Sequence, residues 1–156
     1  MSSPVEAADV TIGLETFGDL PTIKGGEIAT HAQALRQVLA EATLADQVGV
    51  DAYGAGEHHR DDFSISAPDI VMAAIAGATE RIRVGSAVTV LSSDDPVRVY
   101  ERFATVDALS GGRADLIVGR GSFIESFPLF GLDLSQYEIL FEEKLDLLAE
   151  LLREKP

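Results

Sequence analysis

Short apolar segments alternate four times with longer segments of helical spacing along this 156-residue chain. Strict alternation of strand and helix predicts a parallel sheet, because parallel strands need a long crossover connection that a helix usually supplies. The sequence therefore predicts an α/β fold, a parallel (βα)4 unit. Right-handed crossovers leave two arrangements open, half of a closed barrel or an open doubly wound sheet. The expected strands span residues 10–14, 51–56, 82–91 and 114–118, and the first of them reads as buried.

Local signals mark the ends of the expected helices. Ser66 is the expected N-cap of the second helix, and Asp95 followed by Pro96 opens the third. Ser135 and Glu138 have the spacing of a capping box, which predicts the start of the fourth helix. The helices are expected over residues 30–48, 67–79, 96–110 and 135–152.

Composition narrows the class of protein. We expect one domain over residues 1–156, with 1–9 as a flexible leader, since 46% hydrophobic residues suffice for a core at this length. A net charge of −14 disfavours nucleic acid and anionic membrane surfaces as partners. The absence of cysteine excludes disulfides and thiolate chemistry. Residues 1–8 lack the features of a signal peptide and no apolar run spans a bilayer, so a cytoplasmic protein is expected.

Ionisable, polar or glycine-rich residues end each expected strand. When parallel strands carry such residues at one end, that end is usually the working face of an α/β enzyme. We therefore expect these four segments to meet at one edge of the sheet. They are Glu15-Thr16-Phe17, Glu57-His58-His59, Leu91-Ser92-Ser93 and Gly119-Arg120-Gly121.

The segment around His58 has three readings. One histidine could act as a general base, because imidazole titrates near neutral pH. A metal-dependent hydrolase built on Glu57, His58, His59 and Asp61 is the second, although no helical His-x-x-x-His spacing is present. The third is a polar surface loop. Local sequence leaves all three open.

Gly119-Arg120-Gly121 directly follows a strand. Glycine lets a ligand approach the backbone, and arginine offers a fork of donors for a phosphate or carboxylate. A tight turn with a structural arginine is an equally good reading. The segment matches neither a Walker loop nor the dinucleotide-binding fingerprint.

Several of these segments together resemble one family. Gly54-x-Gly-Glu57-His58-His59, the run 84–88 with Pro96-Val97-Arg98, and Asp107-x-Leu-Ser-x-Gly-Arg113 ahead of Gly119-Arg120-Gly121 resemble bacterial luciferase-like flavin-dependent monooxygenases. The resemblance covers residues 10–153. It implies a TIM (β/α)8 barrel, of which the chain supplies the N-terminal half.

The resemblance also implies roles for individual residues. His58 matches an active-site histidine proposed as a base, and Arg120, followed by Gly121, matches an arginine that contacts the flavin phosphate. Ala87 and Val88 match the place where the family often has a cis non-proline peptide against the flavin ring. Thr16, Phe17, Glu57 and His59 would line the pocket by position, and no metal is expected there.

The implied activity is an oxidoreductase that uses reduced FMN and molecular oxygen on a small organic substrate. NAD(P)H or a partner flavin reductase would supply the reduced flavin, and some branches of the family use a deazaflavin coenzyme. The alternative is a non-catalytic flavin-binding protein or a truncated structural half-barrel. A half-barrel exposes strand edges and part of an apolar face, so we also expect a homo-oligomer.

Overall fold

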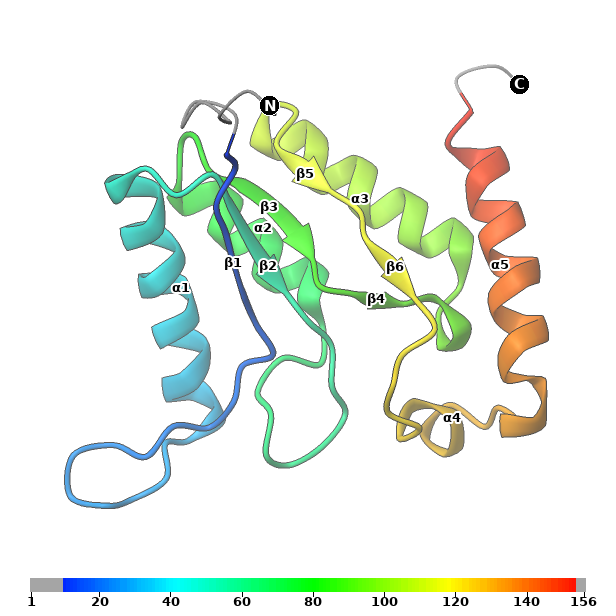
Figure 1. The fold of residues 1–156 in the computed structure, drawn as a ribbon, viewed down its shortest axis with the longest axis horizontal. Helices are drawn as coiled ribbons and strands as arrows, with labels where there is room; N and C mark the ends of the chain where they lie inside the picture. The colour runs from blue at the N-terminus through cyan, green and yellow to red at the C-terminus, as the bar shows by residue number, and fades with distance from the viewer. Residues whose placement is uncertain (1–9, 154–156) are drawn as a thin grey trace, which may run out of the picture.

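The computed structural model describes residues 10–153, so the expected leader over 1–9 lies outside the described residues. Its main sheet is parallel throughout, with the strand order β1-β2-β3-β5. These strands span Gly13–Thr16, Ala52–Ala55, Arg83–Ser86 and Ala114–Asp115. A second parallel pair, β4 (Thr89–Val90) and β6 (Val118–Gly119), follows β3 and β5 along the chain (Figure 1). The predicted parallel α/β fold is confirmed.

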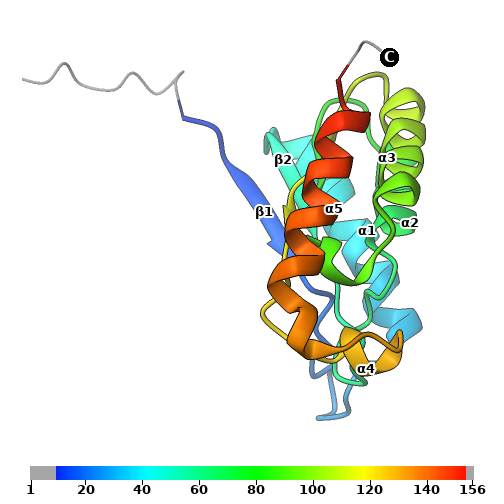
Figure 2. The ribbon, with the colours of Figure 1, turned by 90° about the vertical axis from the view of Figure 1, so that its right-hand side faces the viewer.

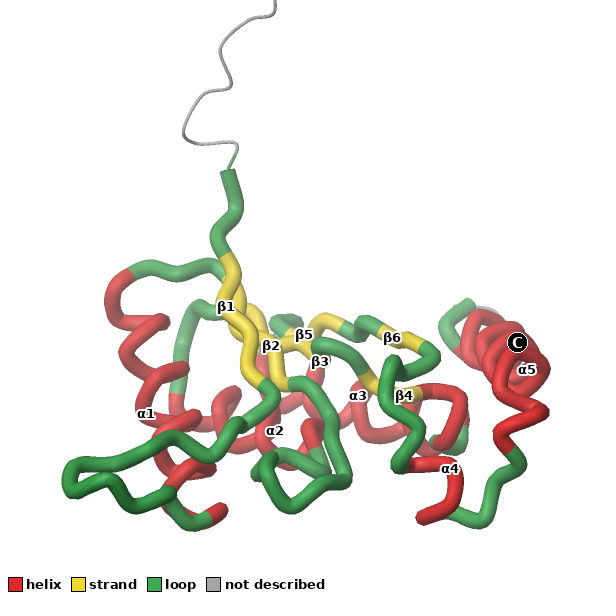
Figure 3. The backbone as a smooth tube through the Cα atoms, turned by 60° about the horizontal axis from the view of Figure 1, so that its bottom comes forward, coloured by secondary structure: helices red, strands yellow, loops and turns green. Residues whose placement is uncertain are grey.

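The helices settle which arrangement the sheet adopts. Helices α1 (His31–Val48), α2 (Pro68–Ala78) and α3 (Pro96–Ser110) all lie on the same face of the strand layer (Figures 2 and 3). A doubly wound sheet would carry helices on both faces, whereas a barrel carries them on one. Helix α5 (Tyr137–Leu151) packs beside α3, and the short α4 (Ser126–Leu129) precedes it. The chain is therefore a half-barrel.

The core lies between the strands and these helices. Tyr53, Ala55 and Val84 project from the sheet and meet apolar residues of the helices. Full burial of a large apolar side chain such as Val84 contributes about 1.5–3 kcal/mol. The helical contribution comes from one face of each helix, as the three-to-four spacing predicts. It includes Val38, Ala42, Met72, Ile75, Val99, Phe103, Val106 and Leu148. None of the helices within residues 10–153 is both long and apolar enough to cross a bilayer.

The opposite face of the sheet carries a row of small and charged residues. The strand register aligns Glu15, Gly54, Gly85 and Asp115 across β1, β2, β3 and β5. Arg83 forms an ion pair with Asp115 on the same sheet. No helix of residues 10–153 covers this face (Figure 3). It corresponds to the inside of a closed barrel.

Three expected strands differ in detail from the structure. The first begins at Gly13 rather than residue 10 and is exposed rather than buried, with Ile12 just before it 59% exposed. Its position at the edge of the sheet explains this, because no described strand pairs with its outer side. The expected 82–91 strand is interrupted by a cis peptide bond between Ala87 and Val88 and gives way at Leu91 to a 3-10 turn. The expected 114–118 strand divides into β5 and β6.

Helix ends were predicted with mixed success. Asp95 caps α3 by accepting from the Arg98 backbone N–H, as expected. Ser66 does not cap α2, because the N-cap is Ala67 and Pro68 opens the helix. The capping box at Ser135 is also wrong, since that residue sits in a 3-10 turn capped by Asp133.

Candidate functional site

A cavity of about 200 Å³ lies where β2, β4 and β6 end. It brings together most of the residues that the sequence singled out, from segments more than 60 positions apart. Phe17, Glu57, His58, His59, Ala87, Val88 and Gly121 all line it. The remaining lining residues, which sequence reasoning did not identify, are Val90, Ser122, Phe123, Glu125 and Ser126.

His58 is held in an aromatic enclosure. Its ring stacks on Phe63 with centroids 4.3 Å apart, and the edges of Phe17 and Phe123 complete the enclosure at 4.9 and 4.5 Å. The side chain is consequently buried, with the whole residue 6% exposed. Its backbone N–H donates to the Ile65 carbonyl over 3.0 Å, which ties the end of β2 to the following loop. The imidazole therefore has little freedom to reorient.

Glu125 makes the polar contact to this ring. His58 Nδ1 lies 2.9 Å from Glu125 Oε1. Although burial opposes ionisation, the hydrogen bond from His58 lowers the pKa of Glu125 below its usual value. Glu125 is thus a carboxylate at neutral pH, and a carboxylate can only accept a hydrogen bond. His58 Nδ1 is the donor of this pair.

The neighbouring histidine is paired through its other nitrogen. His59 Nε2 lies 2.8 Å from Glu57 Oε1, and Glu57 Oε2 accepts from the Val90 backbone N–H over 3.2 Å. Burial raises the pKa of Glu57, and the hydrogen bonds from His59 and Val90 offset part of that effect. Glu57 is therefore the more easily protonated of the two site carboxylates.

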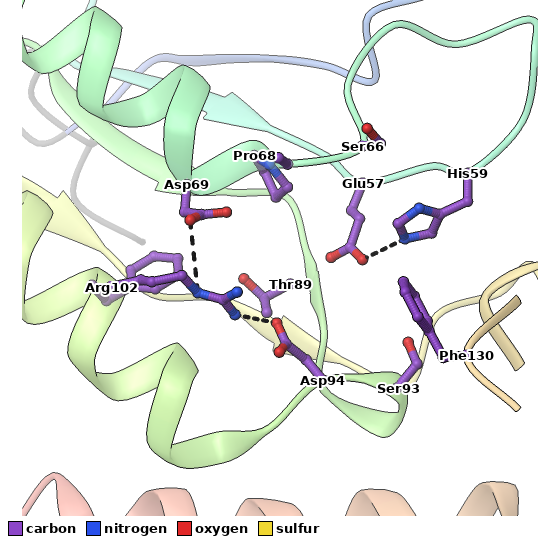
Figure 4. Close-up of a pocket in the computed structure, with 12 residues that line it drawn as sticks. Glu57, His59, Ser66, Pro68, Asp69, Thr89, Ser93, Asp94, Arg102 and Phe130 are labelled. Carbon is purple, nitrogen blue, oxygen red and sulfur yellow. Dashed lines mark hydrogen bonds and ion pairs between the residues drawn. The ribbon is translucent and has the colours of Figure 1, made fainter. Parts of the chain in front are cut away.

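Glu57 and His59 also line a second cavity of about 300 Å³ (Figure 4). On its far side Arg102 pairs with Asp94, and its Nε lies 3.7 Å from Asp69. The Glu57–His59 pair is therefore part of the wall between the two cavities. Residues 10–153 contain no group of three or more His, Asp or Glu side chains arranged to hold a metal ion.

Close backbone approach shapes the smaller cavity. The Ala87–Val88 peptide is cis, in agreement with the expectation from the resemblance. Gly121 has φ +76°, and a Cβ there would lie 2.7 Å from the Val90 side chain. A Cβ on Gly56 would meet the Phe17 ring at 2.2 Å. Glycine is required at Gly56 for the end of β2 to approach Phe17, and at Gly121 for the end of β6 to approach Val90 of β4.

Two predicted residues lie outside this cavity. Arg120 is half exposed, forms a 2.6 Å ion pair with Glu138 and lies over the Phe141 ring. Thr16 accepts a hydrogen bond from the Gly18 backbone N–H and lines a different hollow beside α1.

Apart from Val90 in β4, the residues missed by sequence reasoning come from the segment that follows β6 and ends at Ser126, the first residue of α4. Its serine is the most informative, because Ser126 is 2% exposed and its Oγ has no hydrogen-bond partner among residues 10–153. A buried hydroxyl without a partner is costly, so this one suits a polar ligand atom or a water. The only local signal was the run Ser122-Phe-Ile-Glu-Ser126, which places a carboxylate and two hydroxyls after the glycine pair.

Comparison with known proteins gives a consistent family match. The family described as luciferase-like monooxygenase matches residues 17–156. N-acetyl-S-alkylcysteine monooxygenase of Bacillus subtilis is 31% identical over 83% of this chain and 40% of its own length. The chain spans only 36% and 37% of the first two curated relatives it matches.

Solved structures of low sequence identity share the fold. The oxygenating constituent of 3,6-diketocamphane monooxygenase from the CAM plasmid of Pseudomonas putida, solved with FMN, superposes with a TM-score of 0.78 at 22% identity. That match covers 94% of this chain and 40% of the other. An F420-dependent secondary alcohol dehydrogenase, solved with an F420-acetone adduct, gives 0.68 at 21% identity, covering 94% and 44%. In each case this chain aligns with less than half of the other chain.

Proposed function

The chain belongs to the luciferase-like monooxygenase family, and on that premise we propose that it carries half of the active site of a flavin-dependent oxidoreductase. The observation that supports this most is the small cavity at the strand ends, where His58, Ala87, Val88 and Gly121 meet. FMN is the proposed cofactor, and a deazaflavin coenzyme is the alternative within the same family.

The cavity suits part of a flavin rather than all of it. Its volume of about 200 Å³ lies below the roughly 300–1,000 Å³ typical of complete small-molecule sites. Aromatic and aliphatic walls from Phe17, Val88 and Phe123 fit a flat ring, and the unpartnered Ser126 hydroxyl fits a polar atom on its rim. The rest of the cofactor would extend along the uncovered strand ends.

Arg120 is the proposed phosphate ligand. Its present partner, Glu138, is exposed, and exposed ion pairs contribute little to stability. Replacement of the Glu138 carboxylate by a phosphate should therefore cost little free energy. A phosphate matches the donor geometry of the guanidinium at least as well as a carboxylate does. The exchange would turn Arg120 from an intramolecular partner into a cofactor contact.

The bound reduced flavin would supply electrons to molecular oxygen for the oxidation of a small organic substrate. The chain's own contribution is to hold the ring against Ala87–Val88, to exclude water with Phe17 and Phe123, and to move a proton at His58. A histidine suits that task because its pKa lies near the working pH of most enzymes. NAD(P)H or a partner reductase would regenerate the reduced flavin.

A titration of FMN and riboflavin against this chain tests the assignment. Riboflavin lacks the phosphate, so Arg120→Ala should weaken FMN binding by about tenfold and leave riboflavin binding unchanged. Glu138→Gln should tighten FMN binding, because it releases Arg120. Arg153→Ala is the matched control, since Arg153 forms a similarly exposed pair with Glu150. An equal loss of affinity for FMN and for riboflavin in Arg120→Ala would contradict the proposed contact between Arg120 and the phosphate.

A non-catalytic flavin-binding role is the second candidate. It is considered because the chain spans 36% of the first curated relative and 40% of the diketocamphane monooxygenase chain. Oxygen consumption in the presence of reduced FMN separates the two. Acceleration by this chain that is lost in His58→Ala supports catalysis, whereas flavin binding without acceleration supports the second role.

We also propose that the half-barrel self-associates. The edge of β1 and the groove between β1 and α1 expose Leu14, Leu44 and Val48, and a second copy could cover this apolar surface. Light scattering coupled to size-exclusion chromatography should then give twice the monomer mass at micromolar concentration. A stable monomer would contradict the proposal.

A further inference from the structure

Two adjacent histidines are held through opposite ring nitrogens by two different carboxylates. His58 uses Nδ1 to contact Glu125, whereas His59 uses Nε2 to contact Glu57. The two carboxylates come from separate parts of the chain, since Glu125 is 67 residues from His58 and Glu57 is two residues from His59. Such an arrangement assigns each ring a definite proton position.

The proton position of His58 follows from simple hydrogen-bond chemistry. Because ionised Glu125 offers only acceptor oxygens, the hydrogen between the two groups belongs to Nδ1. A neutral imidazole carries one N–H, so Nε2 then carries the lone pair. His58 Nε2 makes no hydrogen bond to any side chain or backbone group of residues 10–153. The lone pair is thus free for a proton from outside the protein.

Aromatic packing restrains the orientation of the His58 ring but not its tautomer. Phe63 stacks on one face of His58, while Phe17 and Phe123 approach with their edges. Contacts of this kind restrain the plane of the ring but do not distinguish its two nitrogens. Only the Glu125 contact makes that distinction.

We infer that Glu125 is a positioning residue, which fixes His58 in the Nδ1–H tautomer and so presents Nε2 to the smaller cavity as a proton acceptor. The catalytic meaning of this acceptor rests on the proposed function. The tautomer itself follows from the contact with Glu125 alone. His59 has the opposite arrangement and therefore serves as an internal control.

Nitrogen-15 NMR of the imidazole rings tests the inference on the chain as it exists. The sequence contains three histidines, and the third, His31, is exposed at the start of α1, so it provides a reference for an unrestrained ring. The Nδ1 and Nε2 shifts distinguish the two neutral tautomers. Wild type should show the Nδ1–H form for His58 and the Nε2–H form for His59 at a pH where both rings are neutral.

Three variants separate the contributions. Glu125→Ala should change the His58 tautomer ratio by at least about tenfold toward that of His31, because it removes a hydrogen bond to a charged group. Glu125→Gln should restore the Nδ1–H form, since the side-chain amide oxygen can still accept. Glu57→Ala should move the His59 signals and leave those of His58 in place. Backbone amide spectra check that each variant is folded.

The inference is overturned if His58 keeps its tautomer in Glu125→Ala, or if wild-type His58 is in the Nε2–H form. A general loss of structure would shift all three histidines together, so it is distinguishable from the expected local change. Failure of the proposed function has a different signature, namely absence of FMN binding by wild type with the tautomers as expected. The two ideas can therefore fail separately.

Discussion

Replacement of Arg113 should destabilise the fold without touching the candidate site. Arg113 lies between α3 and β5, just before Ala114, at the end of the sheet opposite the cavity. Its guanidinium donates to the backbone carbonyls of Ala76, Thr79, Ile82 and Ser110 and to the Thr79 hydroxyl, at 2.7–3.0 Å. One side chain thus joins the ends of α2 and α3 to Ile82, the residue before β3, and satisfies carbonyls at the end of α2 that lack helical partners.

The size of the effect follows from those contacts. A hydrogen bond from a charged group contributes about 1.5–3 kcal/mol, and five such bonds to one group are far from additive. Water can replace part of the loss, because Arg113 is only partly buried. We therefore expect Arg113→Ala to cost about 3 kcal/mol, a large share of the 5–15 kcal/mol typical of a domain. Arg113→Lys should lose about half as much unfolding free energy, because a lysine ammonium cannot donate to all of the same carbonyls at once.

Urea denaturation followed by circular dichroism measures this cost. With a slope of about 2 kcal/mol per molar urea, Arg113→Ala should lower the midpoint by about 1.5 M. Arg83→Ala is the control, because its ion pair with Asp115 is largely exposed and should contribute less than about 1 kcal/mol. Equal midpoints for Arg113→Ala and Arg83→Ala would refute the reasoning.

Two further predictions concern pH. Burial opposes the ionisation of Asp46, but backbone N–H groups of Ile82, Glu80 and Arg81 lower its pKa below 3.8, so Asp46→Asn should cost about 1–2 kcal/mol at pH 7 in urea titrations. The difference in unfolding free energy between wild type and Asp46→Asn should shrink as the pH falls through the lowered pKa of Asp46. A difference that stays constant with pH would contradict this prediction. Burial raises the pKa of Glu57, so wild type loses stability as the pH rises through that pKa. The stability of Glu57→Gln relative to wild type should therefore rise between pH 4 and pH 8. A fall in this stability difference over the same range would contradict the predicted direction.

The elements that could be predicted from the sequence are those with local causes. The four-fold alternation gave the parallel sheet, and Asp95 and Gly111 gave the ends of α3, because caps and glycine stops act within a few residues. The cis peptide at Ala87–Val88 was expected only from the family resemblance, since no propensity predicts a cis bond between these residues, and the break in the expected 82–91 strand was not predicted. The choice between barrel and open sheet required the positions of the helices.

The candidate site was predictable only in part. Phe17, Glu57, His58, His59 and Gly121 were found because they end strands, and strand ends of a parallel sheet meet. Glu125 and Ser126 lie in a segment that local signals describe only as a loop, and tertiary packing brings them to His58. The position of Arg120 outside the cavity was also not predictable, because its ion pair with Glu138 depends on where α5 packs.

Mapping FMN binding by backbone amide NMR tests the central claim most directly, because it detects weak binding and locates it. On addition of FMN, the account predicts shifts confined to the strand ends, around His58, Ala87, Val88 and Gly121 through Ser126, with a smaller effect near Arg120. Amides around Arg113, at the opposite end of the sheet, should stay in place. Shifts centred on that opposite end, or no shifts at millimolar FMN, would contradict the claim that these strand ends form half of a flavin site.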